Sequence, residues 1–155
     1  MINSGRSLFP DQDEALVHAS CVALDTKALL ILGGSGAGKS SLALSLMSLG
    51  AQLVADDRVS LRMERGSVTA SSPKTIAGLI EARGLGILNA PHGPAGLAWV
   101  VDMDEVETER LPLSRKIVVL RQTLPLFHTV KSPHFAALLM QLMKSGRVAP
   151  EWPTR

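Results

Sequence analysis

The stretch LLILGGSGAGKS, residues 29–40, decides the local fold around which this chain is organised. Its four leading apolar residues predict a buried strand, and the loop that follows has the pattern G-x-x-x-x-G-K-[ST]. Glycines let consecutive backbone N–H groups converge on phosphate oxygens, and the N-terminus of a following helix adds partial positive charge. At average residue frequencies this pattern arises by chance in roughly one chain in two hundred of this length. The stretch therefore predicts a binding site for the phosphates of a nucleotide.

The residues at the end of this loop have specific expected roles. Lys39 is expected to reach the β- and γ-phosphates, and the Ser40 hydroxyl is expected to ligate Mg²⁺, a hard cation that prefers oxygen. Apolar residues then recur with helical spacing over 39–49, and Gly50 is a natural stop. The sequence thus predicts ATP and Mg²⁺ as cofactors. The predicted nucleotide-binding residues are Gly33, Gly34, Ser35, Gly36, Ala37, Gly38, Lys39 and Ser40.

A second group of acidic residues follows the apolar run 52–55. Asp56 and Asp57 end this run, and adjacent side chains at a strand end point to opposite sides. One carboxylate can therefore face the phosphates and accept a proton from an incoming hydroxyl, while the other braces the loop. An alternative stays open, in which the two acids simply begin a solvated turn. Glu81 precedes a glycine-rich segment and is either a further magnesium ligand or a surface acid.

The remaining apolar pattern predicts strands that alternate with helices, with hairpin-like pairs between them. An α/β fold with a mixed sheet is therefore expected. The chain is expected to form a single P-loop domain, 1–155, with a polar lead-in over 1–14 and a loose tail over 145–155. Strands are predicted over 17–24, 28–32, 52–55, 58–62, 67–70, 97–101 and 116–120, helices over 39–49, 73–81 and 133–144, and a long loop over 84–96.

Composition argues against several other classes of protein. Aromatic residues make up 3%, which is too few for a stacking surface for single-stranded nucleic acid, and the net charge is only +2. No apolar run approaches the ~20 residues of a membrane span, and residues 1–14 lack the apolar core of a signal peptide. The one cysteine, Cys21, lies in an apolar run and is expected to be buried. We expect a cytoplasmic protein with no nucleic-acid or membrane partner.

Four segments occur in an order that resembles a known family. They are His18, the phosphate loop, LVADDRV (53–59) and LIEARGLGILN (79–89). Together they are similar to the catalytic domain of the HPr serine kinase/phosphorylase family, in its short bacterial form without the N-terminal domain. The resemblance covers about residues 16–121. It implies a P-loop fold related to the nucleotide-binding fold of phosphoenolpyruvate carboxykinases, a hexamer, and ATP-dependent phosphorylation of a serine on HPr, the phosphocarrier of the sugar phosphotransferase system.

The resemblance also implies roles for individual residues. The phosphate-binding lysine of the family falls on Lys39, and its magnesium ligands fall on Ser40 and Glu81. The acid that takes the serine proton, and returns it in the reverse reaction, falls on Asp57. The active-site histidine falls on His18, which from the residues alone would be interpreted as structural.

Other positions match the family less closely. The catalytic arginine falls on Arg110, with Arg115 as a rival. Family members usually have Asp or Pro at position 34 and an acid at position 41, where this chain has Gly34 and Ser41. The Gly-Arg-Asn segment linked to dephosphorylation in long members is absent from 113–133, so kinase activity is expected to exceed phosphorylase activity. The alternatives are a kinase for another protein or a small molecule, and a nucleotide-binding regulatory module without turnover.

Overall fold

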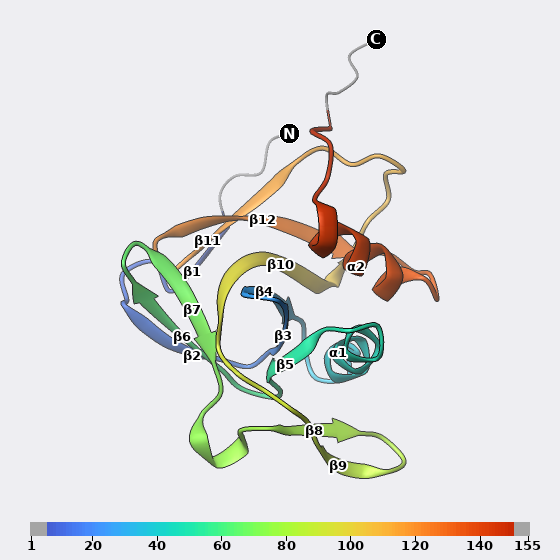
Figure 1. Ribbon diagram of the computed structural model, residues 1–155. Helices are drawn as coiled ribbons and strands as arrows, with labels where there is room; N and C mark the ends of the chain where they lie inside the picture. Colours follow the sequence, from blue (N-terminus) through green and yellow to red (C-terminus); the bar gives the residue numbers. More distant parts are fainter. Residues whose placement is uncertain (1–5, 151–155) are drawn as a thin grey trace.

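The computed structural model describes residues 6–150, which form a strongly curved mixed sheet with two helices and a separate hairpin (Figure 1). The α/β class with a mixed sheet is as predicted. The elements are β1 (Arg6–Leu8), β2 (Glu14–Val17), β3 (Ser20–Leu24), β4 (Lys27–Leu32), α1 (Lys39–Ser48), β5 (Gln52–Ala55), β6 (Val59–Glu64), β7 (Ser67–Ser71), η1 (Lys74–Ile76), β8 (Leu79–Ala82), β9 (Gly86–Asn89), β10 (Ala95–Val106), β11 (Arg115–Val119), β12 (Gln122–Thr129) and α2 (Phe135–Ser145).

The centre of the sheet is a set of three parallel strands, β12, β10 and β4. Within residues 6–150 the main path runs β1-β11-β12-β10-β4-β3-β5, and β7, β6 and β2 branch from the start of β10. β10 lies parallel to both β4 and β12, whereas β3, β5 and β7 are antiparallel to their neighbours. Because parallel strands end at the same edge, the C-terminal end of β10 lies beside the loop that leaves β4. This edge positions the candidate site.

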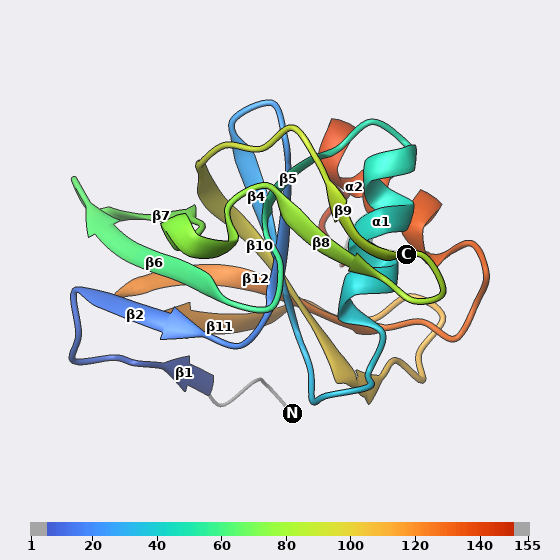
Figure 2. The same ribbon diagram turned by 90° about the horizontal axis from the view of Figure 1, so that it is seen from below.

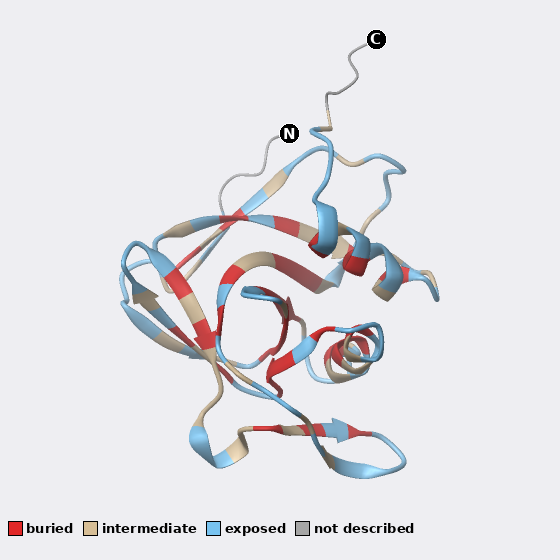
Figure 3. Ribbon diagram, in the orientation of Figure 1, coloured by how far each residue is buried: buried red, intermediate tan, exposed pale blue. Residues whose placement is uncertain are grey.

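Apolar side chains form one buried cluster on each face of the sheet, and both helices belong to the same cluster. One cluster packs α1 and α2 against β4, β5 and β10, and includes Leu29, Ile31, Leu46 and Leu139. The other fills the space between β3, β6, β7, β11 and β12 and is also almost entirely aliphatic. Figure 3 shows the buried segments of β10 and α1 facing the interior of the fold. Both helices therefore lie on one face, and the phosphate loop connects α1 to a strand that is buried except at its first residue, Lys27.

The segment 73–96 differs from its prediction. The predicted helix over 73–81 is wrong: only the 3₁₀ turn η1 forms, and β8 follows it. The predicted long loop is also wrong in part, since β9 pairs with β8 in antiparallel register. Ile80 of β8 is buried in the cluster around α1, and Figure 2 shows the hairpin crossing over this helix. Apolar spacing over a run this short does not distinguish a strand from a helix, and tertiary packing decides between them.

Smaller differences lie near the two ends. The lead-in 1–14 contains β1 and the first residue of β2, and β12 was not predicted. The tail is not loose at its start, because Arg147 donates to the Pro112 carbonyl at 3.1 Å and lies over the Phe127 ring at 5.3 Å. The part of the predicted tail over 151–155 lies outside the described residues. Within 6–150, neither helix has the length and apolar character to cross a membrane.

Cys21 is completely buried in β3. Burial raises the pKa of its thiol, because the charged thiolate loses solvation there. The prediction of a buried cysteine is therefore confirmed.

Candidate active site

The phosphate loop connects β4 to α1 through residues with left-handed backbone. Gly38 has a φ of 94° immediately before α1, a conformation that strains any residue with a Cβ atom. Lys39 begins the helix, and its side chain is largely buried. Its ammonium group donates to the carbonyl oxygens of Gly33 at 2.8 Å and Gly34 at 3.0 Å. Because an ammonium group has three N–H donors, one is left for a phosphate oxygen.

Asp56 is the buried member of the acidic pair and is 5% exposed. Its carboxylate accepts hydrogen bonds from the hydroxyls of Ser20 at 2.6 Å and Ser40 at 2.8 Å, and from the backbone N–H of Glu81 at 3.2 Å. These donors come from β3, α1 and β8. Asp56 therefore ties the start of the P-loop helix to the hairpin, and compensates its own burial with three donors.

Asp57 is the exposed member of the pair. It has a φ of 72°, a left-handed conformation that Asp tolerates better than most residues. Its carbonyl accepts a hydrogen bond from Ala19 N–H at 3.3 Å, which helps to hold this conformation. Its carboxylate shares a hydrogen bond with His18 Nε2 at 3.1 Å. The two carboxylates thus point to opposite sides, and the one on Asp57 faces solvent next to an imidazole.

These groups surround a cleft with a volume of about 400 Å³. It contains five of the predicted catalytic and metal-binding residues, which the chain brings together from β3, α1, β5 and β8 and their flanking turns. Gly33, Gly34 and Ala37 of the predicted nucleotide loop do not line it, although two of them hold Lys39 through their carbonyls. The lining residues are His18, Ser20, Ser35, Gly36, Gly38, Lys39, Ser40, Ser41, Asp57, Glu81 and Arg83.

Neither candidate for the catalytic arginine lines this cleft. Arg110 is exposed in the segment between β10 and β11. Arg115 forms a bidentate ion pair with the buried carboxylate of Glu107. Burial raises the pKa of the Glu107 carboxyl, but the hydrogen bond and charge of Arg115 and two backbone N–H donors outweigh it, so the net pKa is lowered. Arg115 is therefore engaged in a structural pair, and the role given to Arg110 stays a prediction.

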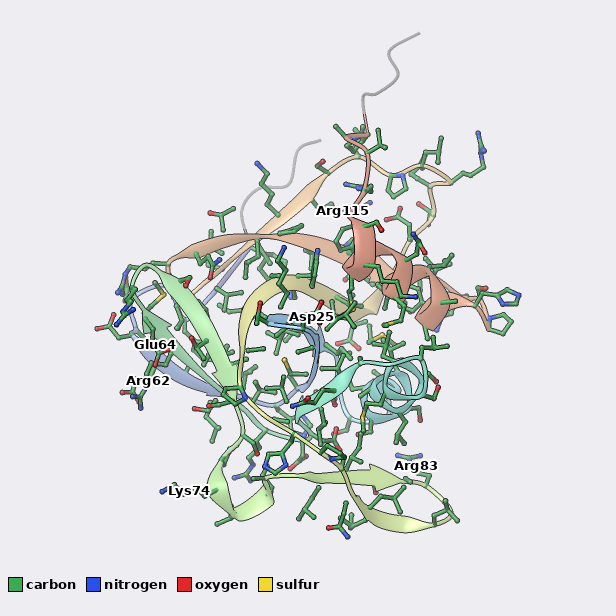
Figure 4. The ribbon with its side chains drawn as sticks, in the orientation of Figure 1. Asp25, Arg62, Glu64, Lys74, Arg83 and Arg115 are labelled. Atoms are coloured by element: carbon green, nitrogen blue, oxygen red, sulfur yellow. The ribbon has the colours of Figure 1, made fainter. Side chains whose placement is uncertain are left out.

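Arg83 is a cleft residue for which the sequence patterns predicted no role. It is exposed at the end of β8, and in Figure 4 its side chain rises from the hairpin toward α1, whereas Arg115 lies on the other side of the molecule. Its signal in the sequence is its position between Glu81 and the two glycines at 84 and 86, within one of the four segments that carry the family resemblance. Arg83 and Lys39 are the arginine and the lysine among the described residues that line the cleft.

The cleft offers few oxygen ligands, which suits a Mg²⁺ ion that is also bound by phosphates and water better than a metal ion coordinated only by protein side chains. Ser40 and Glu81 both line the cleft, and the Ser40 hydroxyl donates a hydrogen bond to Asp56, which leaves an oxygen lone pair for a cation. No group of three or more His, Cys, Asp or Glu side chains within 6–150 has the arrangement of a metal site. Mg²⁺ characteristically takes one or two protein ligands together with substrate phosphates and water.

A second cavity of about 370 Å³ adjoins the cleft and shares Ser40, Asp57 and Glu81 with it. Its other wall is apolar and comes from the segment 76–87, with Ile76, Leu79 and Ile87. Asp57 is therefore reachable from two directions. One is lined by the phosphate loop, and the other by the hairpin.

Comparison with known proteins gives consistent results. A family profile described as the HPr Serine kinase C-terminal domain matches residues 12–107. The HPr kinase/phosphorylase of Clostridium tetani is 40% identical over 93 residues, which are 60% of this chain and 30% of that protein. The protein of the same name from Bacillus cytotoxicus is 47% identical over 74 residues, 47% of this chain and 24% of that one. The chain thus covers less than a third of the length of these relatives.

The fold is also similar to a solved structure. The structure of the Hpr(Ser) kinase/phosphatase from Coxiella burnetii superposes with a TM-score of 0.73 at 25% sequence identity. The match covers 84% of this chain and 88% of that one, so it extends over most of the described sheet.

Proposed function

The chain belongs to the HPr serine kinase C-terminal domain family, and on that premise we propose that it is a Mg²⁺-dependent kinase that transfers the γ-phosphoryl group of ATP to a serine of HPr. One observation carries the proposal. Lys39, Ser40, Asp57 and Glu81 line a single cleft, so groups suited to bind phosphate, magnesium and a hydroxyl proton are within one site. Phosphoryl transfer needs mainly positioning and electrostatic stabilisation, and this cleft offers groups for both.

The nucleotide phosphates would bind across the N-terminus of α1. Ser35, Gly36, Gly38 and Lys39 line the cleft here, so backbone N–H groups of the loop and the remaining N–H of Lys39 would bind the phosphate oxygens. Mg²⁺ would be held by Ser40 and Glu81 and would neutralise charge on the transferred group. Arg83, which also lines the cleft, would stabilise the equatorial oxygens of that group in the transition state.

Asp57 would act as the proton acceptor. As the serine oxygen forms a bond to the γ-phosphorus, the bond from that phosphorus to the bridging oxygen breaks and ADP leaves with the electron pair. The serine proton passes to the Asp57 carboxylate, which the hydrogen bond to His18 orients. The serine would approach through the adjoining cavity, whose apolar wall of Leu79 and Ile87 is suited to a protein surface.

The test is incubation with labelled ATP, Mg²⁺ and purified HPr, followed by identification of the labelled residue. Transfer to one serine of HPr supports the proposal. Transfer to a different protein or a small molecule, with none to HPr, supports the first alternative. Nucleotide binding without any transfer supports the regulatory module instead. A hexameric assembly and a cytoplasmic location also belong to the proposal, and sedimentation and fractionation of the native protein test them.

A further inference from the structure

The C-terminal end of β10 provides an acid that contacts the phosphate loop. β10 lies parallel to β4, with Asp102 opposite Leu32, so the residues after Asp102 lie beside the loop that follows Leu32. There both carboxylate oxygens of Asp104 accept a hydrogen bond from the backbone N–H of Gly34, at 3.1 and 3.0 Å. Asp104 is exposed and does not line the nucleotide cleft.

The same peptide group is also held at its other end. The N–H of Gly34 and the carbonyl of Gly33 belong to one peptide unit, and that carbonyl accepts the Lys39 ammonium at 2.8 Å. A carboxylate and an ammonium therefore hold one amide between them, with Asp104 on the N–H and Lys39 on the C=O. Hydrogen bonds to charged groups are about twice as strong as neutral ones, and bonds in series polarise one another. The orientation of this peptide thus couples Asp104 to the P-loop lysine.

Asp104 is itself fixed by the strand behind it. Its backbone N–H donates to Asp102 at 2.9 Å, and the largely buried Asp102 carboxylate pairs with Arg6 of β1 at 2.5 Å. Arg6 lies outside the segment 12–107 that matches the family. A continuous chain of polar contacts therefore runs from β1 through the end of β10 to the phosphate loop.

We propose that Asp104 is a positioning residue for the nucleotide site: it fixes the Gly33–Gly34 peptide, and through that peptide it holds the Lys39 ammonium in place for the phosphates. The proposal rests on the proposed function in one respect, which is that the ligand of the site is a nucleotide. Asp104 acts through the peptide because its carboxylate lies outside the cleft.

The first arm of the test needs no nucleotide. The amide ¹H and ¹⁵N resonances of Gly34 and the carbonyl ¹³C resonance of Gly33 are compared between wild type, D104A, D104N and the control E105A. Glu105 is the neighbouring exposed acid, so E105A removes a similar charge without touching Gly34. In D104A the Gly34 amide proton should move upfield and the Gly33 carbonyl should shift, and in D104N both changes should be smaller, because an asparagine oxygen still accepts. E105A should leave both resonances unchanged.

The second arm measures Mg²⁺·ADP affinity by calorimetry on the same four proteins. D104A should weaken binding by about three- to tenfold, D104N by less, and E105A by less than twofold, in line with the modest net worth of one hydrogen bond. Unmoved Gly34 and Gly33 resonances in D104A, or wild-type ADP affinity in D104A, would overturn the proposal. Failure of the wild-type protein to bind either ADP or ATP would overturn the proposed function instead. In that case, resonance shifts confined to the Asp104 variants would still support the coupling from Asp104 through Gly34 to Lys39.

Discussion

Replacing Asp57 by asparagine separates the proton-accepting role of this residue from its structural role. Asparagine has the same shape, keeps an oxygen that can accept from His18, and tolerates the positive φ at this position. It cannot take up a proton from the serine hydroxyl. The substitution therefore removes the general base and leaves the rest of the cleft in place.

The expected magnitude follows from where the side chain lies. Asp57 is 62% exposed, so Asp57→Asn should change the free energy of unfolding by no more than about 0.5 kcal/mol. The network of Asp56 with Ser20 and Ser40 does not include Asp57, so nucleotide affinity should be nearly unchanged. General-base catalysis contributes about a hundred- to ten-thousandfold, and kcat should fall by a factor in that range.

The assay is steady-state transfer of label from ATP to HPr, with nucleotide affinity and thermal unfolding measured on the same samples. Asp25→Asn is the matched control. Asp25 is also an exposed aspartate with positive φ, but it lies in the turn between β3 and β4 and does not line the cleft. The control should keep wild-type turnover. If Asp57→Asn retains turnover within about threefold of wild type while Asp56→Asn is inactive, the roles of the two carboxylates are assigned the wrong way round.

Four further outcomes are expected. Lys39→Ala should weaken Mg²⁺·ATP binding by about ten- to a hundredfold, because a charged donor to the phosphates is lost, and unchanged affinity in calorimetry would contradict the P-loop assignment. Arg83→Ala should lower kcat by about a hundred- to a thousandfold with little change in nucleotide affinity, whereas equal kcat would exclude Arg83 from the transition state. Glu107→Gln should lower the free energy of unfolding at pH 7, as measured by denaturant unfolding, because the lowered pKa of Glu107 stabilises the fold while the carboxyl is ionised. The difference in this free energy between variant and wild type should shrink as the pH falls below about 4.3. A difference independent of pH would contradict the ion pair with Arg115. Phosphate-dependent release of label from phosphoserine-HPr should be slower than the forward transfer. The described cleft lining has one arginine and one lysine, Arg83 and Lys39, and an added phosphate needs more donors. Equal rates would refute this.

Local sequence patterns determined the parts of the molecule whose structure depends on near neighbours. The stretch 29–40 predicted a strand, a glycine loop and a helix, and β4 and α1 have these positions. The acidic pair at the end of β5 was located in the same way. In these segments hydrophobic periodicity and the backbone freedom of glycine act over a few residues, so the pattern and the structure coincide.

The tertiary structure decided what depends on pairing between distant segments. Residues 79–82 form a strand, not a helix, because Ile80 is buried near α1 and residues 86–89 supply the partner strand. The same hairpin turns Arg83 into the cleft, a direction that spacing along the chain does not contain. Asp104 reaches Gly34, seventy positions away in sequence, because β10 happens to run parallel to β4. Strand register is set by long-range packing, and so the contacts that hold the P-loop lysine were decided by the fold and not by the motif.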